Sequence, residues 1–185
     1  MILMVSLLLT ACAPQYDTPT EQVIQQGEQV IEEQILAEQT AGQVAWKDAE
    51  LTDVATSQPF KISDFAGKTI LVESFAVWCP KCLSQQEEFA AFGVENPDIL
   101  LISLDTDANE DTEKVRTHIE RYGFDWYFAV SPIEATNALI DEFGLGIVSA
   151  PSTPVILICA DQRTRYLPSG IKSADDLTKE VAAGC

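Results

Sequence analysis

Residues 69–92 (TILVESFAVWCPKCLSQQEEFAAF) join a strand-like segment directly to a helix-like one, and this junction limits the fold more than any other feature. The first part, 69–77, is rich in β-branched and aromatic residues, as is typical of a buried central strand. From Cys82 onward helix-forming residues predominate. The apolar face of this helix is predicted to contain Leu83, Phe89, Ala90 and Phe92.

The motif Cys79-Pro80-Lys81-Cys82 falls at this junction, with Pro80 in the first helical turn, where a missing N–H is harmless. A thiolate at a helix N-terminus is stabilised by the helix dipole and by free backbone N–H groups, which lowers its pKa. Lys81 adds a positive charge nearby. The spacing lets Cys82 reach Cys79 one helical turn away. Cys79 is therefore predicted to attack a substrate disulfide, and Cys82 to resolve the mixed disulfide.

Glu73 lies six positions before Cys79, inside the apolar strand. Burial raises the pKa of a carboxyl group, so a buried Glu73 would accept or return the Cys82 proton during exchange. The alternative is a glutamate on the outward face of the strand, and the sequence leaves both open.

The rest of the chain continues to alternate between strand and helix patterns, which predicts an α/β fold. The acidic segment 105–111 lacks the glycine and terminal glutamate of an EF-hand calcium loop, so we interpret it as a solvated loop. His118, the only histidine, is interpreted as a surface residue in mid-helix, and no second ligand pair for structural zinc is present. Strands are predicted at 99–104 and 126–130, and helices at 112–122, 133–143 and 173–182.

These features resemble the thioredoxin superfamily, and specifically its membrane-tethered TlpA/ResA-like branch with a redoxin-type domain, over about residues 44–185. The resemblance is carried by 71–82 (LVESFAVWCPKC), by the lead-in 60–68 (FKISDFAGK) and by 150–158 (APSTPVILI). It implies a thioredoxin fold with a central mixed β-sheet flanked by helices. It also implies an extra strand and helix between the active-site helix and the strand after Pro154.

The resemblance further implies roles for residues around the thiols. Pro154 would be cis, would face the two cysteines of the motif and would keep metals off them. The Thr153 backbone would offer strand-like hydrogen bonds to a bound peptide, and thioredoxins proper carry a buried Asp where this chain has Glu73. No cofactor is implied. The residues expected to bind substrate or to shape the active site are Trp78, Pro80, Lys81, Thr153 and Pro154.

The N-terminal residues indicate export. Residues 1–9 (MILMVSLLL) are almost wholly apolar, but they are too few to cross a bilayer, which takes about 20 residues. Their length fits the apolar region of an export signal, and Leu9-Thr10-Ala11-Cys12 resembles a lipobox. We therefore expect a lipoprotein signal peptide over 1–11, with Cys12 acylated. No Lys or Arg precedes the apolar run, and a plain secretory signal is the alternative.

Two further segments complete the expected organisation. Residues 12–43 are an acidic, Gln/Glu-rich tether, and residues 44–185 form the thioredoxin-like domain. The chain has 29 Asp and Glu against 11 Lys and Arg, a net charge of −18, so phosphate backbones would repel it and nucleic acid is not expected as a partner. We expect an extracytoplasmic protein, held to the membrane by the lipid on Cys12.

The predicted function is thiol–disulfide exchange with exported proteins, coupled to an electron-transfer partner in the membrane. A thiol peroxidase is one alternative, but Ala76 stands where peroxiredoxins carry Thr or Ser. A metal-binding chaperone is the other, and such relatives need a C-x-x-x-C motif and a downstream histidine. Cys159 and Cys185 would form a second, structural disulfide in an oxidising compartment. The sequence does not give their Cα separation, so two free thiols stay equally open.

Overall fold

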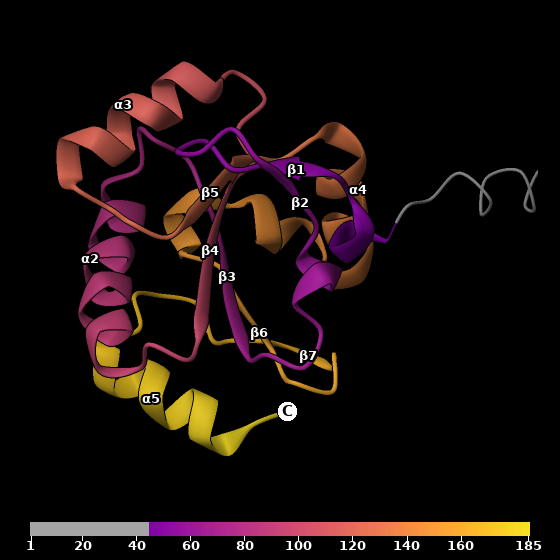
Figure 1. Cartoon of the computed structure of the whole chain (residues 1–185), viewed down its shortest axis with the longest axis vertical. Helices are drawn as coiled ribbons and strands as arrows, with labels where there is room; N and C mark the ends of the chain where they lie inside the picture. Colours follow the sequence, from indigo (N-terminus) through magenta and orange to yellow (C-terminus); the bar gives the residue numbers. More distant parts are fainter. Residues whose placement is uncertain (1–44) are drawn as a thin grey trace, which may run out of the picture. The chain divides into compact units, whose positions relative to one another are not determined.

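The computed structural model describes residues 45–185, which are built around a five-stranded mixed sheet in the order β5-β4-β3-β6-β7 (Figure 1). Strands β3, β4 and β5 are parallel, whereas β6 runs antiparallel to β3, and β7 antiparallel to β6. A two-stranded hairpin, β1-β2, lies beside this sheet. The strands are β1 (Leu51–Thr52), β2 (Pro59–Phe60), β3 (Ile70–Phe75), β4 (Leu100–Asp105), β5 (Tyr127–Val130), β6 (Val155–Ile158) and β7 (Thr164–Tyr166).

Helices cover both faces of the sheet. Figure 1 shows α2, α3 and α5 on one side, and α4 with the hairpin on the other. Two strand–helix units, β4-α3 and β5-α4, separate α2 from β6, which confirms the predicted thioredoxin fold with its additional strand and helix. The helices are α2 (Pro80–Glu95), α3 (Thr112–Tyr122), α4 (Ile133–Phe143) and α5 (Ala174–Ala183), with short 3-10 turns η1 (Trp46–Asp48), η2 (Ile62–Phe65), η3 (Leu145–Val148) and η4 (Ala150–Ser152).

Strand β3 is the middle strand of the sheet, and all six of its residues are buried. Successive side chains of a strand point to opposite faces of the sheet. Ile70 and Val72 accordingly pack in the core that includes Leu139 of α4, whereas Leu71 packs with Phe89 of α2. This alternation directs Glu73 to the same face as Leu71, toward the helix that carries the motif.

The predicted elements agree closely with the structure, apart from the acidic segment. Helices 112–122 and 133–143 have the predicted bounds, and the predicted strands 99–104 and 126–130 each begin one residue earlier than observed. Asp105, however, is the last residue of β4 and is buried. The interpretation of 105–111 as a solvated loop is therefore wrong for its first residue.

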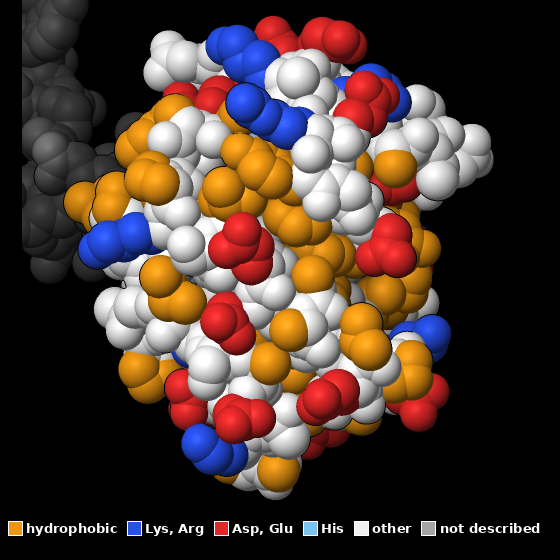
Figure 2. Space-filling model, turned by 90° about the vertical axis from the view of Figure 1, so that its left-hand side faces the viewer, with side chains coloured by type: hydrophobic (Ala, Val, Ile, Leu, Met, Phe, Trp, Pro, Cys, Tyr) orange, Lys and Arg blue, Asp and Glu red, His pale blue; other side chains and the backbone are white. Residues whose placement is uncertain are grey.

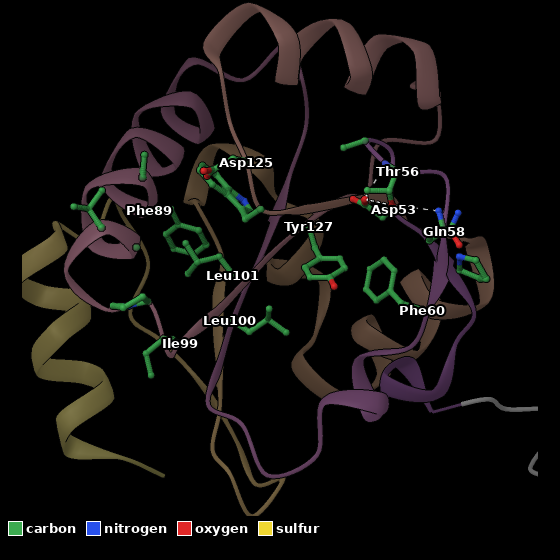
Figure 3. Close-up of a pocket in the computed structure, with 17 residues that line it drawn as sticks. Asp53, Thr56, Gln58, Phe60, Phe89, Ile99, Leu100, Leu101, Asp125 and Tyr127 are labelled. Carbon is green, nitrogen blue, oxygen red and sulfur yellow. Dashed lines mark hydrogen bonds between the residues drawn. The ribbon is translucent and has the colours of Figure 1, made fainter.

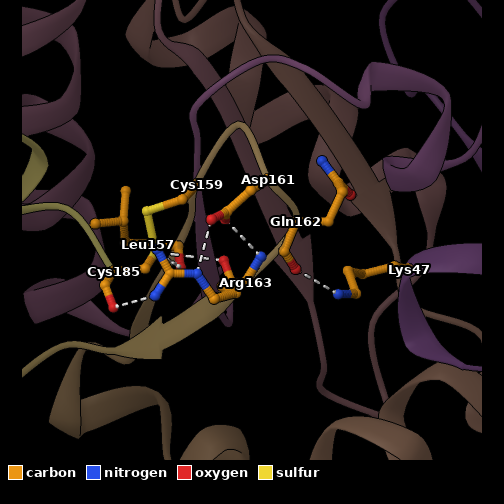
Figure 4. A network of polar contacts seen from close by, with 7 residues as sticks. All are labelled: Lys47, Leu157, Cys159, Asp161, Gln162, Arg163 and Cys185. Atoms are coloured by element: carbon orange, nitrogen blue, oxygen red, sulfur yellow. Dashed lines mark hydrogen bonds and ion pairs between the residues drawn. A yellow bond between two sulfur atoms is a disulfide. The ribbon is translucent and has the colours of Figure 1, made fainter.

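The expected signal peptide, the lipidation site Cys12 and the tether all lie outside the described residues. Within residues 45–185, no helix is both long and apolar enough to cross a membrane. The second cysteine pair does lie in the described part. Cys159, just after β6, forms a disulfide with Cys185 across a Cα–Cα distance of 6.0 Å, which confirms the proposed pairing (Figure 4).

Candidate functional site

Cys79 is the N-cap residue of α2, and Pro80 is the first residue of that helix. The Cys79 backbone is extended (φ −87°, ψ 110°), and its Sγ accepts a hydrogen bond from the Cys82 N–H over 3.3 Å. Both cysteines are free thiols, exposed by only 2 % and 1 %. The rim around them is formed by the exposed residues Trp78, Pro80 and Lys81.

Cys82 is held as a protonated thiol. Its Sγ donates a hydrogen bond to the Ala150 carbonyl over 3.2 Å. Burial is the main cause that raises the pKa of the Cys82 thiol, and the neighbouring Cys79 and the charge of Glu73 raise it further. Cys82 therefore needs a base before it can act as a nucleophile, whereas Cys79 sits at the helix N-terminus and its sulfur accepts a backbone N–H.

Glu73 is buried beneath α2, at 1 % exposure, so the outward-facing alternative is wrong. Burial raises the pKa of its carboxyl group to about 7. Three neighbours favour the charged form and limit this rise, namely Ser103, Gln86 and Lys172. The Ser103 hydroxyl donates to Glu73 Oε1 over 2.7 Å. Glu73 can therefore gain or lose a proton near neutral pH, beside the thiol on which its charge acts.

The segment 150–154 lies against the thiols, as the resemblance implied, but its geometry differs from the expectation. The Thr153–Pro154 peptide bond is trans, so the prediction of a cis Pro154 is wrong. Thr153 instead adopts a left-handed conformation with φ 48°, which turns the chain from η4 into β6. Pro154 is buried, and its carbonyl accepts the Ser74 N–H over 3.1 Å.

The Thr153 backbone is already hydrogen-bonded within the protein. Its N–H donates to the Ala150 carbonyl over 2.9 Å, and its carbonyl accepts from Lys172 Nζ over 2.5 Å. Because both groups are occupied and Thr153 is buried, this backbone is not free to bind a peptide in the conformation described. The role predicted for Thr153 in peptide binding is therefore not supported here.

Two buried glutamines of α2 were not predicted. Gln85 and Gln86 are fully buried, three and four positions after Cys82. Gln85 binds the Lys172 backbone in both directions, with Nε2 donating to the carbonyl (3.1 Å) and Oε1 accepting the N–H (2.8 Å). Their spacing in the sequence could have revealed their burial, because positions 82, 85, 86 and 89 share one helical face. No such spacing in the sequence indicated that Lys172 would be buried near them.

His118 of α3 is buried, and the interpretation of it as a surface histidine is wrong. Its Nε2 lies 2.6 Å from Oε1 of Gln86, and its ring centroid lies 5.9 Å from that of Phe75. Burial is the main cause that lowers the pKa of His118. The sequence misled because the partner of His118 lies on another helix, 32 residues away.

The acidic loop after β4 holds the residues that precede Cys79. The Val77 N–H donates to Glu110 over 2.7 Å, and the Trp78 indole N–H donates to Asp107 over 2.6 Å. Burial is the main cause that raises the pKa of Asp105 to about 8. Over the described part of the chain, no group of three or more His, Cys, Asp or Glu side chains is arranged to hold a metal. The two hydrogen bonds to Val77 and Trp78 make this loop a support for the motif.

A separate groove of about 710 Å³ lies between the β1-β2 hairpin and the C-terminal half of α2, and neither cysteine of the motif lines it (Figure 3). The surface above α2 combines hydrophobic and acidic side chains (Figure 2), and Val94, at the groove edge, is 83 % exposed. The thiol site and this groove are thus separate places on the molecule. Among its lining residues are Phe60, Phe89, Leu100, Leu101, Asp125 and Tyr127.

Solved structures of similar fold were found in a structural comparison, and all those named here share less than a fifth of their residues with this chain. A secreted disulfide oxidoreductase of Mycobacterium tuberculosis, homologous to DsbE of E. coli, is 18 % identical, with a TM-score of 0.57 over 75 % of this chain and 97 % of its own. A thiol:disulfide interchange protein of the thioredoxin family from Chlorobium tepidum is 19 % identical, with a TM-score of 0.61 over 73 % and 91 %.

A third similar structure is BsSco, a member of the Sco family of cytochrome c oxidase assembly proteins, with 15 % identity and a TM-score of 0.58 over 73 % of this chain and 90 % of its own. No curated protein matches the sequence. The Redoxin family profile, however, matches residues 40–181, which is most of the chain. The chain therefore belongs to the Redoxin family and is, by its fold and its paired thiols, a thioredoxin-like oxidoreductase.

Proposed function

We propose that this protein exchanges disulfides with exported proteins, with Cys79 as the attacking thiol and Cys82 as the resolving thiol. The observation that carries the proposal is the difference between the two thiols. Both are buried, but Cys79 caps helix α2, whereas the Cys82 thiol donates to a carbonyl and is influenced by the charge of Glu73. A helix N-terminus favours the thiolate needed for attack, and burial keeps the second thiol protonated until it is needed.

The exchange takes place in two steps. The Cys79 thiolate attacks one sulfur of a substrate disulfide, so that a Cys79–substrate bond forms while the other substrate sulfur leaves as a thiolate. Cys82 then loses its proton to the Glu73 carboxylate and attacks Cys79 Sγ. The Cys79–Cys82 disulfide forms, and the second substrate sulfur leaves with the electron pair. Two electrons pass from protein to substrate, and the same steps in reverse oxidise a dithiol.

The location and partners form part of the same proposal. The N-terminal signal pattern, the lipobox cysteine Cys12 and the structural disulfide Cys159–Cys185 support work outside the cytoplasm, with a lipid anchor in the membrane. The similar protein of Mycobacterium tuberculosis is described as secreted. An electron-transfer partner in the membrane would then return Cys79 and Cys82 to their starting state after each exchange.

Single-cysteine variants test this function. Cys79→Ser should lose the reduction of an aromatic disulfide, whereas Cys82→Ser should accumulate a mixed disulfide on Cys79, seen by mass spectrometry without reductant. Persistent activity in Cys79→Ser would contradict the assignment. If the wild-type protein consumed hydrogen peroxide but exchanged no disulfide, the chain would instead be a thiol peroxidase.

A reduction potential for the Cys79–Cys82 pair, measured in defined thiol buffers, gives the direction of the reaction. A potential near about −270 mV, as in thioredoxin, would identify a reductant, and one near about −120 mV an oxidant.

A further inference from the structure

Lys172 is a buried cation that the exchange steps above do not use. It lies between β7 and α5 and is only 6 % exposed. Its ammonium group donates to two carbonyls, those of Thr153 (2.5 Å) and Gly170 (2.6 Å). Burying an ammonium group is costly unless it is well bonded. The two carbonyls offset that cost and hold the ammonium group in place.

Two paths connect Lys172 with Cys82, one along a turn of α2 and one through hydrogen bonds alone. The first passes through Gln85, one turn after Cys82 on α2, whose amide binds the N–H and the carbonyl of Lys172. The second passes through Thr153, because its carbonyl accepts from Lys172 Nζ while its N–H donates to the Ala150 carbonyl. That same Ala150 carbonyl accepts the Cys82 thiol. Lys172 thus closes a ring of contacts around the resolving cysteine.

The charge of Lys172 also acts on the buried base. Lys172 lowers the pKa of Glu73, although burial is the stronger effect and keeps that pKa at about 7. Burial lowers the pKa of Lys172 itself to about 8, against the opposing charges of Glu73 and Glu180. Glu180 is in turn paired with Arg165 over 2.5 Å. Ser103, Gln86 and Lys172 favour the ionised form of Glu73, and Lys172 is the cation among these three.

We propose that Lys172 is a positioning residue for the resolving step, which holds the carbonyl that binds Cys82 and keeps Glu73 ready to accept the Cys82 proton. The inference rests on the proposed function and deepens it. In the step concerned, the Cys82 S–H bond breaks, its proton goes to Glu73, the Cys82–Cys79 bond forms and the bond from Cys79 to the substrate sulfur breaks. Lys172 itself forms and breaks no covalent bond.

An aromatic disulfide such as 5,5′-dithiobis(2-nitrobenzoate) separates the two steps in one absorbance trace. Attack by Cys79 releases the first coloured thiolate, and resolution by Cys82 releases the second. In Lys172→Met, the first release should keep its rate, while the second should slow by roughly fivefold near pH 7, because raising the pKa of Glu73 from about 7 by about one unit would lower its ionised fraction from about a half to about a tenth. The difference should shrink above about pH 8, where the wild-type lysine loses its charge.

The matched control is Lys179→Met on α5, because that lysine is exposed and, within residues 45–185, pairs with the exposed Asp176. Both releases should keep the wild-type rate in it. A second release that is unchanged at all pH values in folded Lys172→Met would overturn the role of Lys172. If wild-type protein gave no second release, the proposed function itself would fail. If Lys172→Met did not fold, Gln85→Leu would take its place, and an unchanged second release there would also overturn the role.

Discussion

The two cysteine pairs of this chain lie at opposite ends of the same strand pair and have opposite surroundings. Ile158 pairs with Ile70 at the start of β3, so Cys159 lies at the amino end of that strand, whereas Cys79 follows its carboxyl end. Cys79 and Cys82 are buried free thiols three residues apart at a helix N-terminus. Cys159 and Cys185 are half-buried, 26 residues apart and joined as a disulfide.

The polar contacts around the second pair hold the chain end and leave no sulfur free. Arg163 donates to the Cys185 carbonyl over 3.1 Å and binds Asp161 over 2.7 Å (Figure 4). Arg165 donates to the Gly184 carbonyl over 2.9 Å. Around the first pair, by contrast, a buried carboxyl group and a buried ammonium group flank a protonated thiol. The comparison teaches that placement on the fold, and not cysteine content, separates a reactive pair from a structural one.

The largest difference between the pairs should appear in activity. Cys79→Ser should reduce disulfide exchange by roughly a thousandfold or more, because it removes the nucleophile. The double variant Cys159→Ser/Cys185→Ser should keep the wild-type rate per folded molecule, since neither sulfur contacts the motif. Steady-state reduction of a peptide disulfide measures both. A strong loss in the double variant would show that the two ends of the sheet are coupled.

In stability, loss of the structural disulfide should have a larger effect than loss of the Cys79 thiol. Removing the Cys159–Cys185 bridge should lower the free energy of unfolding by about 3 kcal/mol, from the loop that it closes. Cys79→Ser should change it by less than about 1 kcal/mol, because serine is itself a good N-cap. Urea unfolding without reductant gives both values. Equal losses in the two variants would contradict the structural role of the bridge.

Local sequence signals were sufficient for the part of the site that lies on one continuous segment. The change from β-branched residues to helix formers located the end of β3 and the start of α2, and this fixed Cys79 at the helix N-terminus. The apolar surroundings of Glu73 made its burial one of two alternatives, and the structure has it buried. These predictions succeeded because strand and helix patterns depend on near neighbours.

Residues contributed by distant segments were missed. Lys172 meets Gln85 across 87 residues, and His118 meets Gln86 across 32, so no local pattern marks either contact. The expected cis Pro154 came from the resemblance alone, and the left-handed Thr153 replaces it in this chain. Polar side chains in a core are specified by their partners, and those partners are known only once the fold is built.

The carboxyl groups near the two pairs should respond differently to pH. The pKa of Glu73 is raised to about 7 from its usual 4.5, so the folded protein binds this proton more tightly than the unfolded chain. The stability that this group contributes therefore falls as pH rises between these values. Glu73→Gln should become more stable relative to wild type by about 3 kcal/mol from about pH 4.5 to about pH 7.5.

Asp161, beside the structural disulfide, supplies the control for Glu73. Arg163 lowers the pKa of this exposed carboxyl group, so it stays ionised throughout that pH range. Asp161→Asn should accordingly show a constant difference from wild type over the same range. Urea unfolding of each variant at several pH values tests both expectations. A difference between Glu73→Gln and wild type that stays constant with pH would mean that Glu73 is not held with a raised pKa.

The smallest effect is expected at the rim of the reactive pair. Trp78→Phe keeps an aromatic ring beside Cys79 but removes the N–H that donates to Asp107. Because Trp78 is 59 % exposed, water replaces this bond, and the free energy of unfolding should change by less than about 1 kcal/mol. The Trp78 bond is also the main cause that lowers the pKa of Asp107, so this pKa should rise in the variant.

Glu110→Gln is the matched change in the same loop, since Glu110 accepts the Val77 N–H in a partly buried position. It should alter the first release of thiolate from an aromatic disulfide more than Trp78→Phe does, because it replaces the charged acceptor of the Val77 N–H with a weaker, neutral one. Stopped-flow traces of the two variants decide the order. If Trp78→Phe slowed the first release more than Glu110→Gln, the indole would contact the substrate directly. The reactive site would then include its exposed rim as well as the buried residues around Cys79 and Cys82.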